Sequence, residues 1–249
     1  MVKMIEGSLI IHGDLQSREV LTEVLGVFED DPMLAPTRWG SASGLRDPYD
    51  RERIISFLEK SPDRLKPNLI RTRAPNKYAA EWYSSDVAGS FSFDSRGDVS
   101  AGEAEFHFDV ITRLASKVPL EWGHVNVSFE GQEQDTCMSL GGSGVHLGGY
   151  SDFGPTCLFP RTILGPRLLS LMEDRSALTQ SGLHMGELDN GAVYLDLVDS
   201  PWASDPQTLK DAQTRAHEVL SKTGIFAVPN GRYSYVPGPR WEPLDLGFS

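Results

Sequence analysis

Residues 183–197, LHMGELDNGAVYLDL, decide how this chain is expected to fold. The three residues at 189–191, Asp-Asn-Gly, are a strong turn signal, because Asn and Gly adopt positive φ at little cost. After the turn, apolar residues at Val193, Leu195 and Leu197 alternate with polar ones. Alternation with a period of two is typical of a strand with one buried face. The stretch therefore predicts a β-hairpin whose first strand lies near residues 183–188.

Helices are expected on both sides of this hairpin. A short apolar helix is predicted over residues 166–174, which begin with a proline. On the other side, Asp205-Pro206 provides a helix cap followed by proline at the first helical position, where its missing N–H costs nothing. The apolar spacing beyond it predicts a helix over 206–222 that ends at Gly224.

The first half of the chain contains the same order of elements. Apolar spacing predicts a helix over residues 50–60, with Asp47-Pro48 as its cap and first residue, then a hairpin over 78–94 and a helix over 103–117. Helix, hairpin and helix therefore occur twice, which indicates a degenerate duplication. An α+β fold, a mainly antiparallel sheet covered by helices, is the natural way to bury both sets of apolar residues.

We interpret residues 1–249 as a single α+β domain, with pseudo-halves 1–120 and 121–225 and a C-terminal extension over 226–249. A chain of this length buries roughly 70–75% of its unfolded surface and needs no disulfide or metal to fold. Shorter signals complete the expected order of elements. They are a strand at 9–11, a helix over 20–28 capped by Asp14 or Ser17, a strand at 125–129, an irregular glycine-rich stretch over 131–160 and an ordered tail over 229–249.

The charge of the chain limits its partners. Asp and Glu number 35 against 23 Lys and Arg, a formal net charge of −12 that is spread over both halves. Such a charge repels nucleic acid and anionic membranes and attracts basic partners, although a surplus of acids also serves solubility alone. No stretch approaches the roughly 18–20 apolar residues of a membrane span, and the start lacks the apolar run of a signal peptide. A cytoplasmic location is the resulting expectation.

Residues that could carry chemistry form no recognisable constellation. The six histidines are scattered, and no pair has the i, i+4 spacing of a helical zinc site. The glycine-rich run at 141–144 lacks the Lys-Ser/Thr of a phosphate loop, and no Gly-x-Ser-x-Gly elbow surrounds Ser143. The sequence therefore predicts no catalytic residue, no metal site and no cofactor. Two alternatives stay open: a hydrolase whose dispersed site uses His12, Asp14 and the glycine-rich loop, and a small-molecule-binding module with its pocket between the two halves.

Acidic residues are the candidates for binding a protein partner. One run directly follows the predicted helix over 20–28, where the helix dipole disfavours negative charge, which suggests a use other than helix stability. A second set lies in and around the glycine-rich stretch, and long irregular loops are often functional. The candidate partner-binding residues are Glu29, Asp30, Asp31, Glu130, Glu133, Asp135 and Asp152.

The second half also resembles a known family. The segment GELDNGAVYLDL at 186–197, followed by Ser200-Pro201-Trp202, Asp205-Pro206 and the helix ending near Gly224, is similar to the C-terminal part of bacterial immunity proteins. The family is number fifty-two of the polymorphic-toxin classification, which counteracts type VI and contact-dependent toxins. The resemblance implies an immunity protein that binds a cognate toxin and occludes its active site, without catalysis. The family's toxins include nuclease-like domains, whose basic active sites an acidic surface would suit.

Overall fold

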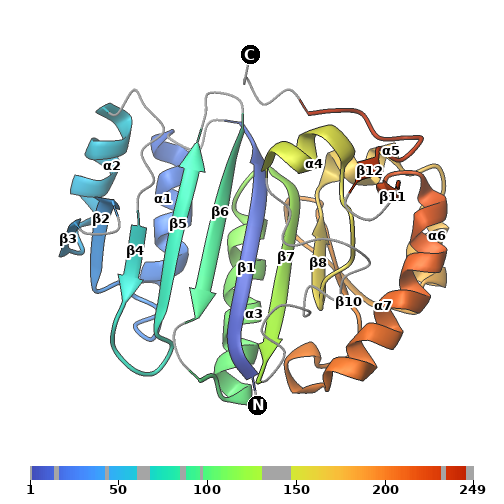
Figure 1. The fold of residues 1–249 in the computed structure, drawn as a ribbon. Coiled ribbons are helices and arrows are strands. Elements are labelled where there is room, and N and C mark those ends of the chain that lie inside the picture. The colour runs from blue at the N-terminus through green and yellow to red at the C-terminus, as the bar shows by residue number, and fades with distance from the viewer. Residues whose placement is uncertain are drawn as a thin grey trace.

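The computed structural model describes residues 2–13, 17–42, 45–60, 68–84, 88–95, 98–130, 147–230 and 234–244. Within these ranges the chain forms one ten-stranded sheet and seven α-helices (Figure 1). Every pair of neighbouring strands in the sheet is antiparallel, and the order is β3-β2-β4-β5-β6-β1-β7-β8-β10-β9. The predicted α+β class with a large antiparallel sheet is therefore confirmed.

The strands and helices follow one another along the whole chain. The strands of the large sheet are β1 (Val2–His12), β2 (Arg38–Ala42), β3 (Leu45–Pro48), β4 (Asn68–Arg71), β5 (Tyr78–Ser84), β6 (Ala88–Ser95), β7 (Leu120–Phe129), β8 (Arg161–Leu164), β9 (His184–Glu187) and β10 (Val193–Asp196). The α-helices are α1 (Arg18–Glu29), α2 (Arg51–Lys60), α3 (Ala101–Ser116), α4 (Leu147–Phe153), α5 (Pro166–Leu171), α6 (Ser176–Gln180) and α7 (Pro206–Leu220). A 3-10 turn, η1 (Pro201–Ala203), precedes α7, another, η2 (Ser221–Thr223), follows it, and β11 (Val228–Pro229) pairs with β12 (Tyr235–Val236).

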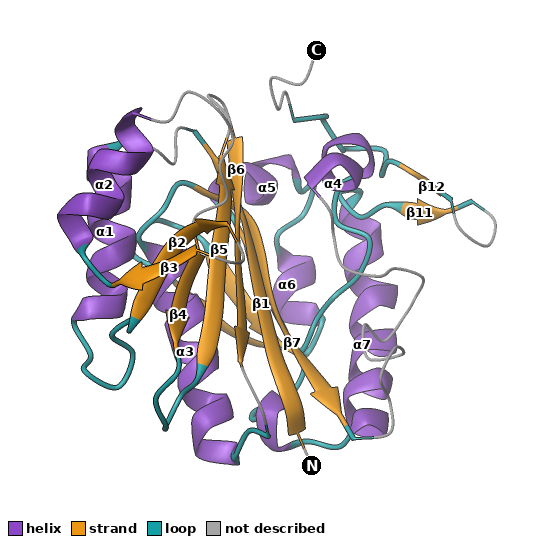
Figure 2. Ribbon diagram, turned by 60° about the vertical axis from the view of Figure 1, so that its left-hand side comes forward, coloured by secondary structure: helices purple, strands orange, loops and turns teal. Residues whose placement is uncertain are grey.

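Helices cover the two faces of the sheet in different halves (Figure 2). Helices α1, α2 and α3 lie on one face, whereas α4, α5, α6 and α7 lie on the other. Strand β1 at the centre shows how this is encoded, because Leu9 and Ile11 pack in the core beneath α1 and α3 while Ile10 packs with Trp122 in the second core. Alternating residues of a central strand thus contribute to two separate apolar cores.

The repeated order of helix, hairpin and helix is confirmed. In the first unit β6 pairs with β1 and β5 pairs with β6, and α3 follows. In the second unit β10 pairs with β8 and β9 pairs with β10, and α7 follows. The two units extend in opposite directions along the sheet and place their helices on opposite faces (Figure 1). A common origin of the units and the proposed domain boundaries stay predictions.

The turn at residues 189–191 is hydrogen-bonded to the C-terminal end of α3. Gly191 has a φ of +80°, a value that favours glycine. The side chain of Asn190 donates to the carbonyl oxygens of Ala115 and Val118, at 2.7 and 2.9 Å, just where α3 ends. The hairpin is therefore held to the first half of the chain as well as closed locally.

Helix boundaries differ from the expected ones at two places. Asp47-Pro48 does not start a helix, because both residues belong to β3 and Asp50 instead accepts a hydrogen bond from the Arg53 N–H at the start of α2. The helix expected over 166–174 ends at Leu171 and is followed by the separate helix α6. Ser17 is confirmed as the cap of α1, whereas Asp14 lies outside the described residues.

The middle of the chain is more regular than expected. Strand β7 begins five residues earlier than the alternation at 125–129 indicated, because its first half is buried on both sides and does not alternate. The glycine-rich stretch over 131–160 contains α4, so an entirely irregular stretch was the wrong expectation. Residues 131–146 of that stretch lie outside the described part of the chain.

A buried ion pair joins the second half of the sheet to α3. Arg161 of β8 donates two hydrogen bonds to the carboxylate of Asp196 on β10, at 2.7 and 2.6 Å, and a third to Thr112 at 2.8 Å. The guanidinium group also lies over the rings of Phe108 and Tyr194. Burial raises the pKa of Asp196, and Arg161 opposes that shift by favouring the charged form. The pair is satisfied only as long as both partners are present.

Candidate functional site

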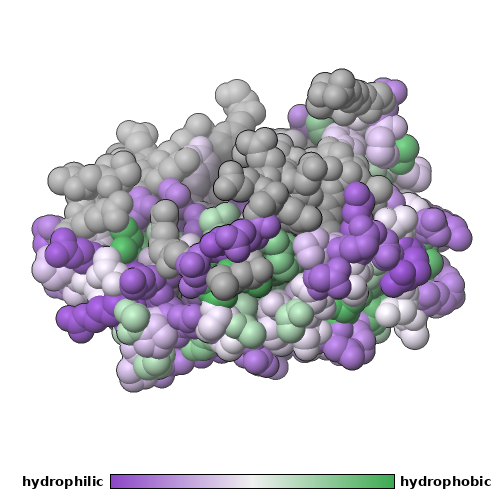
Figure 3. All heavy atoms as spheres, turned by 60° about the horizontal axis from the view of Figure 1, so that its bottom comes forward, coloured by the Kyte–Doolittle hydropathy of each residue, from purple (hydrophilic) through white to green (hydrophobic). Residues whose placement is uncertain are grey.

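A groove opens at the end of the sheet where β1 begins and β7 ends. It has a volume of about 710 Å³ and lies between the start of α3 in the first unit and η1 with the start of α7 in the second. We call it the acidic groove. Its lining residues are Val2, Asp98, Val99, Ser100, Ala101, Glu103, Phe129, Trp202, Ala203, Ser204, Asp205 and Pro206. Figure 3 shows this end of the molecule, where small hydrophobic areas lie among hydrophilic ones.

The α3 side of the groove is built by a capping box. Ser100 is the cap of α3, and its hydroxyl accepts a hydrogen bond from the Glu103 N–H at 3.3 Å. In return, Glu103 accepts from the Ser100 N–H at 3.0 Å and from the Ser100 hydroxyl at 2.7 Å. These hydrogen bonds, the side-chain one most of all, lower the pKa of Glu103. Glu103 is therefore held in place and ionised at neutral pH.

The α7 side is built in a similar way. Asp205 caps α7 and accepts hydrogen bonds from the N–H groups of Gln207 and Thr208, both at 3.0 Å. The Thr208 hydroxyl donates to its second oxygen at 2.6 Å. These bonds, led by that of Thr208, lower the pKa of Asp205. The cap predicted at Asp205-Pro206 is confirmed, and Asp205 also lines the groove.

The third carboxylate of the groove belongs to Asp98. Its side chain is 66% exposed and lies 3.0 Å from the ammonium group of Lys3, which also lies 3.7 Å from Glu130. Among the twelve lining residues, which all fall in the described part of the chain, three are carboxylates and none is Lys, Arg or His. The lining therefore presents net negative charge to solvent.

The floor of the groove is apolar. Seven of the twelve lining residues are apolar, and Val2 and Val99 among them belong to the buried core beneath α3. Trp202 of η1 is partly exposed and packs edge-on against the buried ring of Phe108, 5.1 Å between ring centroids. An aromatic side chain anchored from behind and open in front is typical of a binding surface.

One residue of the acidic run predicted for partner binding, Glu29, contacts other side chains of the protein itself. The carboxylate of Glu29 accepts from the Tyr49 hydroxyl at 2.8 Å and pairs with Arg51, and its side chain is only 27% exposed. Arg51 thus compensates the negative charge at the end of α1, so the unfavourable dipole does not require an external partner. Asp30 caps α1 and is exposed, while Asp31 accepts from the Met33 N–H in the next turn.

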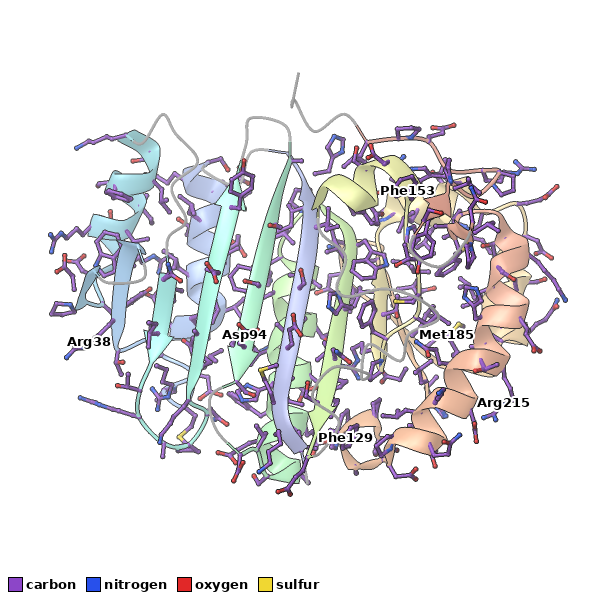
Figure 4. The ribbon with its side chains drawn as sticks, viewed as in Figure 1. Arg38, Asp94, Phe129, Phe153, Met185 and Arg215 are labelled. Carbon is purple, nitrogen blue, oxygen red and sulfur yellow. The ribbon has the colours of Figure 1, made fainter. Side chains whose placement is uncertain are left out.

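Of the other predicted acidic residues, the two in the described part of the chain, Glu130 and Asp152, do not lie on one surface. Glu130 directly follows Phe129 and Asp152 directly precedes Phe153, and these labelled phenylalanines lie at opposite ends of the molecule (Figure 4). Both carboxylates belong to exposed residues. Glu133 and Asp135 lie outside the described residues.

Two of the predicted residues lie at the same end as the acidic groove. Asp31 is connected to it through Asn76, whose side chain donates to the Met33 carbonyl and whose N–H donates to Glu103, each at 3.4 Å. Glu130 is connected through Lys3, which also pairs with Asp98. The end of the sheet that carries the groove therefore carries part of the predicted acidic surface.

The groove residues themselves were missed by the sequence interpretation. Ser100 and Glu103 stand three residues apart, the spacing of a capping box, so the start of α3 could have been located from the sequence. The residues that line the groove could not, because Asp98 and Asp205 are more than one hundred positions apart and only the packing of α3 against η1 brings them together.

The histidines do not assemble with carboxylates into a hydrolytic site within the described residues. Burial lowers the pKa of His107 to about 4 and that of His124 to about 3, and the Nδ1 atom of each has no hydrogen-bond partner. His184 contacts Asp199 on an exposed surface, and His12 is exposed at the end of β1. Across the described ranges, no three His, Cys, Asp or Glu side chains are grouped so that they could hold a metal ion.

None of the helices in the described residues combines the length and the apolar character that a membrane span requires.

Comparisons with known proteins identify a shared fold. No family model matches the chain, and no curated protein matches its sequence. Among solved structures, the chain is similar to the Pseudomonas aeruginosa T6SS protein PA0821, with a TM-score of 0.59 and 12% sequence identity. The match covers 96% of this chain and 79% of that chain. At this identity the likeness shows the fold, and the resemblance to immunity family fifty-two stays a hypothesis.

Proposed function

We propose that this chain is a bacterial immunity protein associated with a type VI secretion system, which binds a cognate toxin and occludes its active site. The observation that carries the proposal is the fold shared with the T6SS protein PA0821 over 96% of the chain. The sequence resemblance of the second half to immunity proteins is independent of that structural comparison and points to the same kind of system.

The acidic groove supports binding as the mode of action. An immunity protein that blocks a nuclease-like toxin has to match a basic active site, and charge complementarity speeds the encounter of the two proteins. The net charge of −12 and the three carboxylates of the groove supply that complementarity. Occlusion needs no chemistry by the chain itself, so we propose a protein that is not an enzyme and that acts in the cytoplasm, where the toxin has to be neutralised.

The proposal is tested by expressing the chain together with the type VI toxin encoded beside it. We expect that a bacterial host producing the toxin grows only when the chain is present. We also expect that the two purified proteins form a one-to-one complex. Growth arrest that the chain does not relieve, with no complex at micromolar concentrations, would overturn the proposal. A catalytically inactive toxin variant allows the complex to be prepared without harm to the host.

A small-molecule-binding module is the second candidate. The groove lies between the two repeated units, which is where that alternative placed its pocket, and its volume of about 710 Å³ falls within the usual range of ligand sites. The test is mass spectrometry of the protein purified under gentle conditions. A small molecule that stays bound to the protein and is released on mild denaturation would favour this candidate over the immunity function.

A further inference from the structure

We propose that the acidic groove receives a polypeptide segment of the partner that carries an arginine or lysine flanked by apolar side chains. This inference rests on the proposed function for the identity of the partner, and it names the chemistry by which the partner is recognised. It is carried by two features of the groove, an apolar floor and a rim of fixed carboxylates, which require different groups on the occupant.

The floor requires apolar side chains. Phe129 of β7 and Trp202 of η1 both line the groove, and Trp202 is supported from behind by the buried ring of Phe108. The support fixes the Trp202 ring before any partner arrives, so little side-chain entropy is lost on binding. Covering this floor removes apolar surface from water, which is the main favourable contribution to most protein association.

The rim requires a cation. Glu103 and Asp205 are held by their own helix starts, and the hydrogen bonds described above keep both ionised at neutral pH. Each carboxylate offers about four lone-pair sites. Among the described residues, Oδ2 of Asp205 accepts one hydrogen bond, from the Thr208 hydroxyl, so capacity for an incoming N–H remains. The planar guanidinium of arginine fits such oxygens with two parallel hydrogen bonds, which favours it over lysine.

The shape and charge of the groove argue against other occupants. The groove is more open than enclosed, whereas a small molecule is normally enclosed over most of its surface. Nucleic acid is disfavoured, because Glu103 and Asp205 repel phosphate and, of the three lining carboxylates, Asp98 is the one paired with a lysine, Lys3. A protruding protein segment satisfies both the open shape and the mixed apolar and acidic lining.

The structure provides variants that change the groove without removing its helix caps. Asp98→Asn, Glu103→Gln and Asp205→Asn together remove three charges, and Gln and Asn retain the capping hydrogen bonds. A matched triple, Glu19→Gln, Glu52→Gln and Glu218→Gln, changes the net charge equally at exposed residues outside the groove. Ala203→Phe fills the groove, and Thr214→Phe adds the same ring to an exposed position in the middle of α7.

The probe is a displayed library of random twelve-residue peptides selected on the full chain. Peptides that bind the wild type and the Thr214→Phe variant but not the Ala203→Phe variant are expected to carry Arg or Lys next to apolar residues. Their affinity is expected to fall about 10- to 100-fold in the groove triple, where up to three charge contacts of a few-fold each are lost, and less than about twofold in the matched triple. Replacing the peptide arginine by citrulline is expected to cause a similar loss.

The outcomes separate this inference from the proposed function. Selection that yields no groove-dependent peptides, or yields neutral or acidic ones, overturns the inference. So does equal binding of the neighbouring toxin by the wild type and the Ala203→Phe variant, although that result leaves the immunity function standing. A chain that selects basic apolar peptides but neither binds nor neutralises that toxin overturns the proposed function and keeps the groove chemistry.

Discussion

Removing Arg161 while leaving Asp196 in place is expected to destabilise the protein severely. Both side chains are almost fully buried, with exposed fractions of 7% and 6%, and the guanidinium donates two hydrogen bonds to the carboxylate. The Arg161→Met variant would leave a charged carboxylate in the interior without a partner. Breaking a buried pair in this way costs about 3–5 kcal/mol, whereas replacing both partners by apolar residues is close to neutral. The double variant Arg161→Met/Asp196→Leu is therefore expected to recover most of the loss.

The assay is urea unfolding followed by circular dichroism, with the free energy of unfolding taken from linear extrapolation and the slopes compared between variants. The partly exposed pair of Arg51 and Glu29 is the control, and Arg51→Met is expected to cost about 1 kcal/mol. The loss in Arg161→Met is also expected to be smaller at pH 4 than at pH 8. Burial raises the pKa of Asp196, and without arginine the carboxyl becomes protonated and neutral in the folded state as the pH falls, which relieves the cost of burying it. A loss under 1 kcal/mol, or one that does not depend on pH, would refute the reasoning.

Three further predictions follow from single positions. Gly165→Ala is expected to lower the unfolding free energy by about 2–3 kcal/mol, because the alanine Cβ would lie 2.0 Å from the Leu120 carbonyl oxygen. The Cβ of Gly26→Ala in α1 meets nothing within 4 Å, so that variant should be more stable by about 0.5–1 kcal/mol. Equal effects of the two variants in urea unfolding would contradict the packing at Gly165. Buried His107 has a pKa of about 4 against 6.5 when unfolded, so the unfolded state binds its proton first and stability is lost as the pH falls from about 6.5 to 4. Unfolding free energies at pH 7.5 and 4.5 should therefore differ by about 2–3 kcal/mol more in the wild type than in His107→Phe, and an unchanged difference would show that His107 is not buried as a neutral group. Glu103→Ala should lower the thermal midpoint through loss of about 1 kcal/mol of capping, while Glu103→Gln should change it little, and equal shifts would argue against the capping box.

Local signals in the sequence predicted the elements that are closed by local hydrogen bonds. The turn at Asn190 and Gly191, the cap at Asp205 and the left-handed stop at Gly224 are all in place. In each case the residue that sets the conformation contacts its own neighbours, so the physical cause is present in the sequence itself.

Elements determined by distant contacts were not predicted. Strand β8 has four residues that are all buried, so it shows no alternation, and the charged Arg161 within it is tolerated only because Asp196 lies opposite on β10. Such a segment cannot be distinguished from a loop until its partner strand is known. The same limit applies to the site. Asp98, Glu103 and Asp205 each have a local or unremarkable role in the sequence, and only the packing of α3 against η1 brings them around one groove.

Hydrogen–deuterium exchange of the chain, alone and bound to the toxin encoded beside it, shows whether the partner covers the acidic groove. We expect slower exchange in the complex at the first turns of α3 and α7, around η1 and at the paired ends of β1 and β7, with little change at α4 and at the start of α1. Protection confined to the opposite end of the sheet, with unchanged exchange around Glu103 and Trp202, would contradict the claim that the acidic groove is the binding surface.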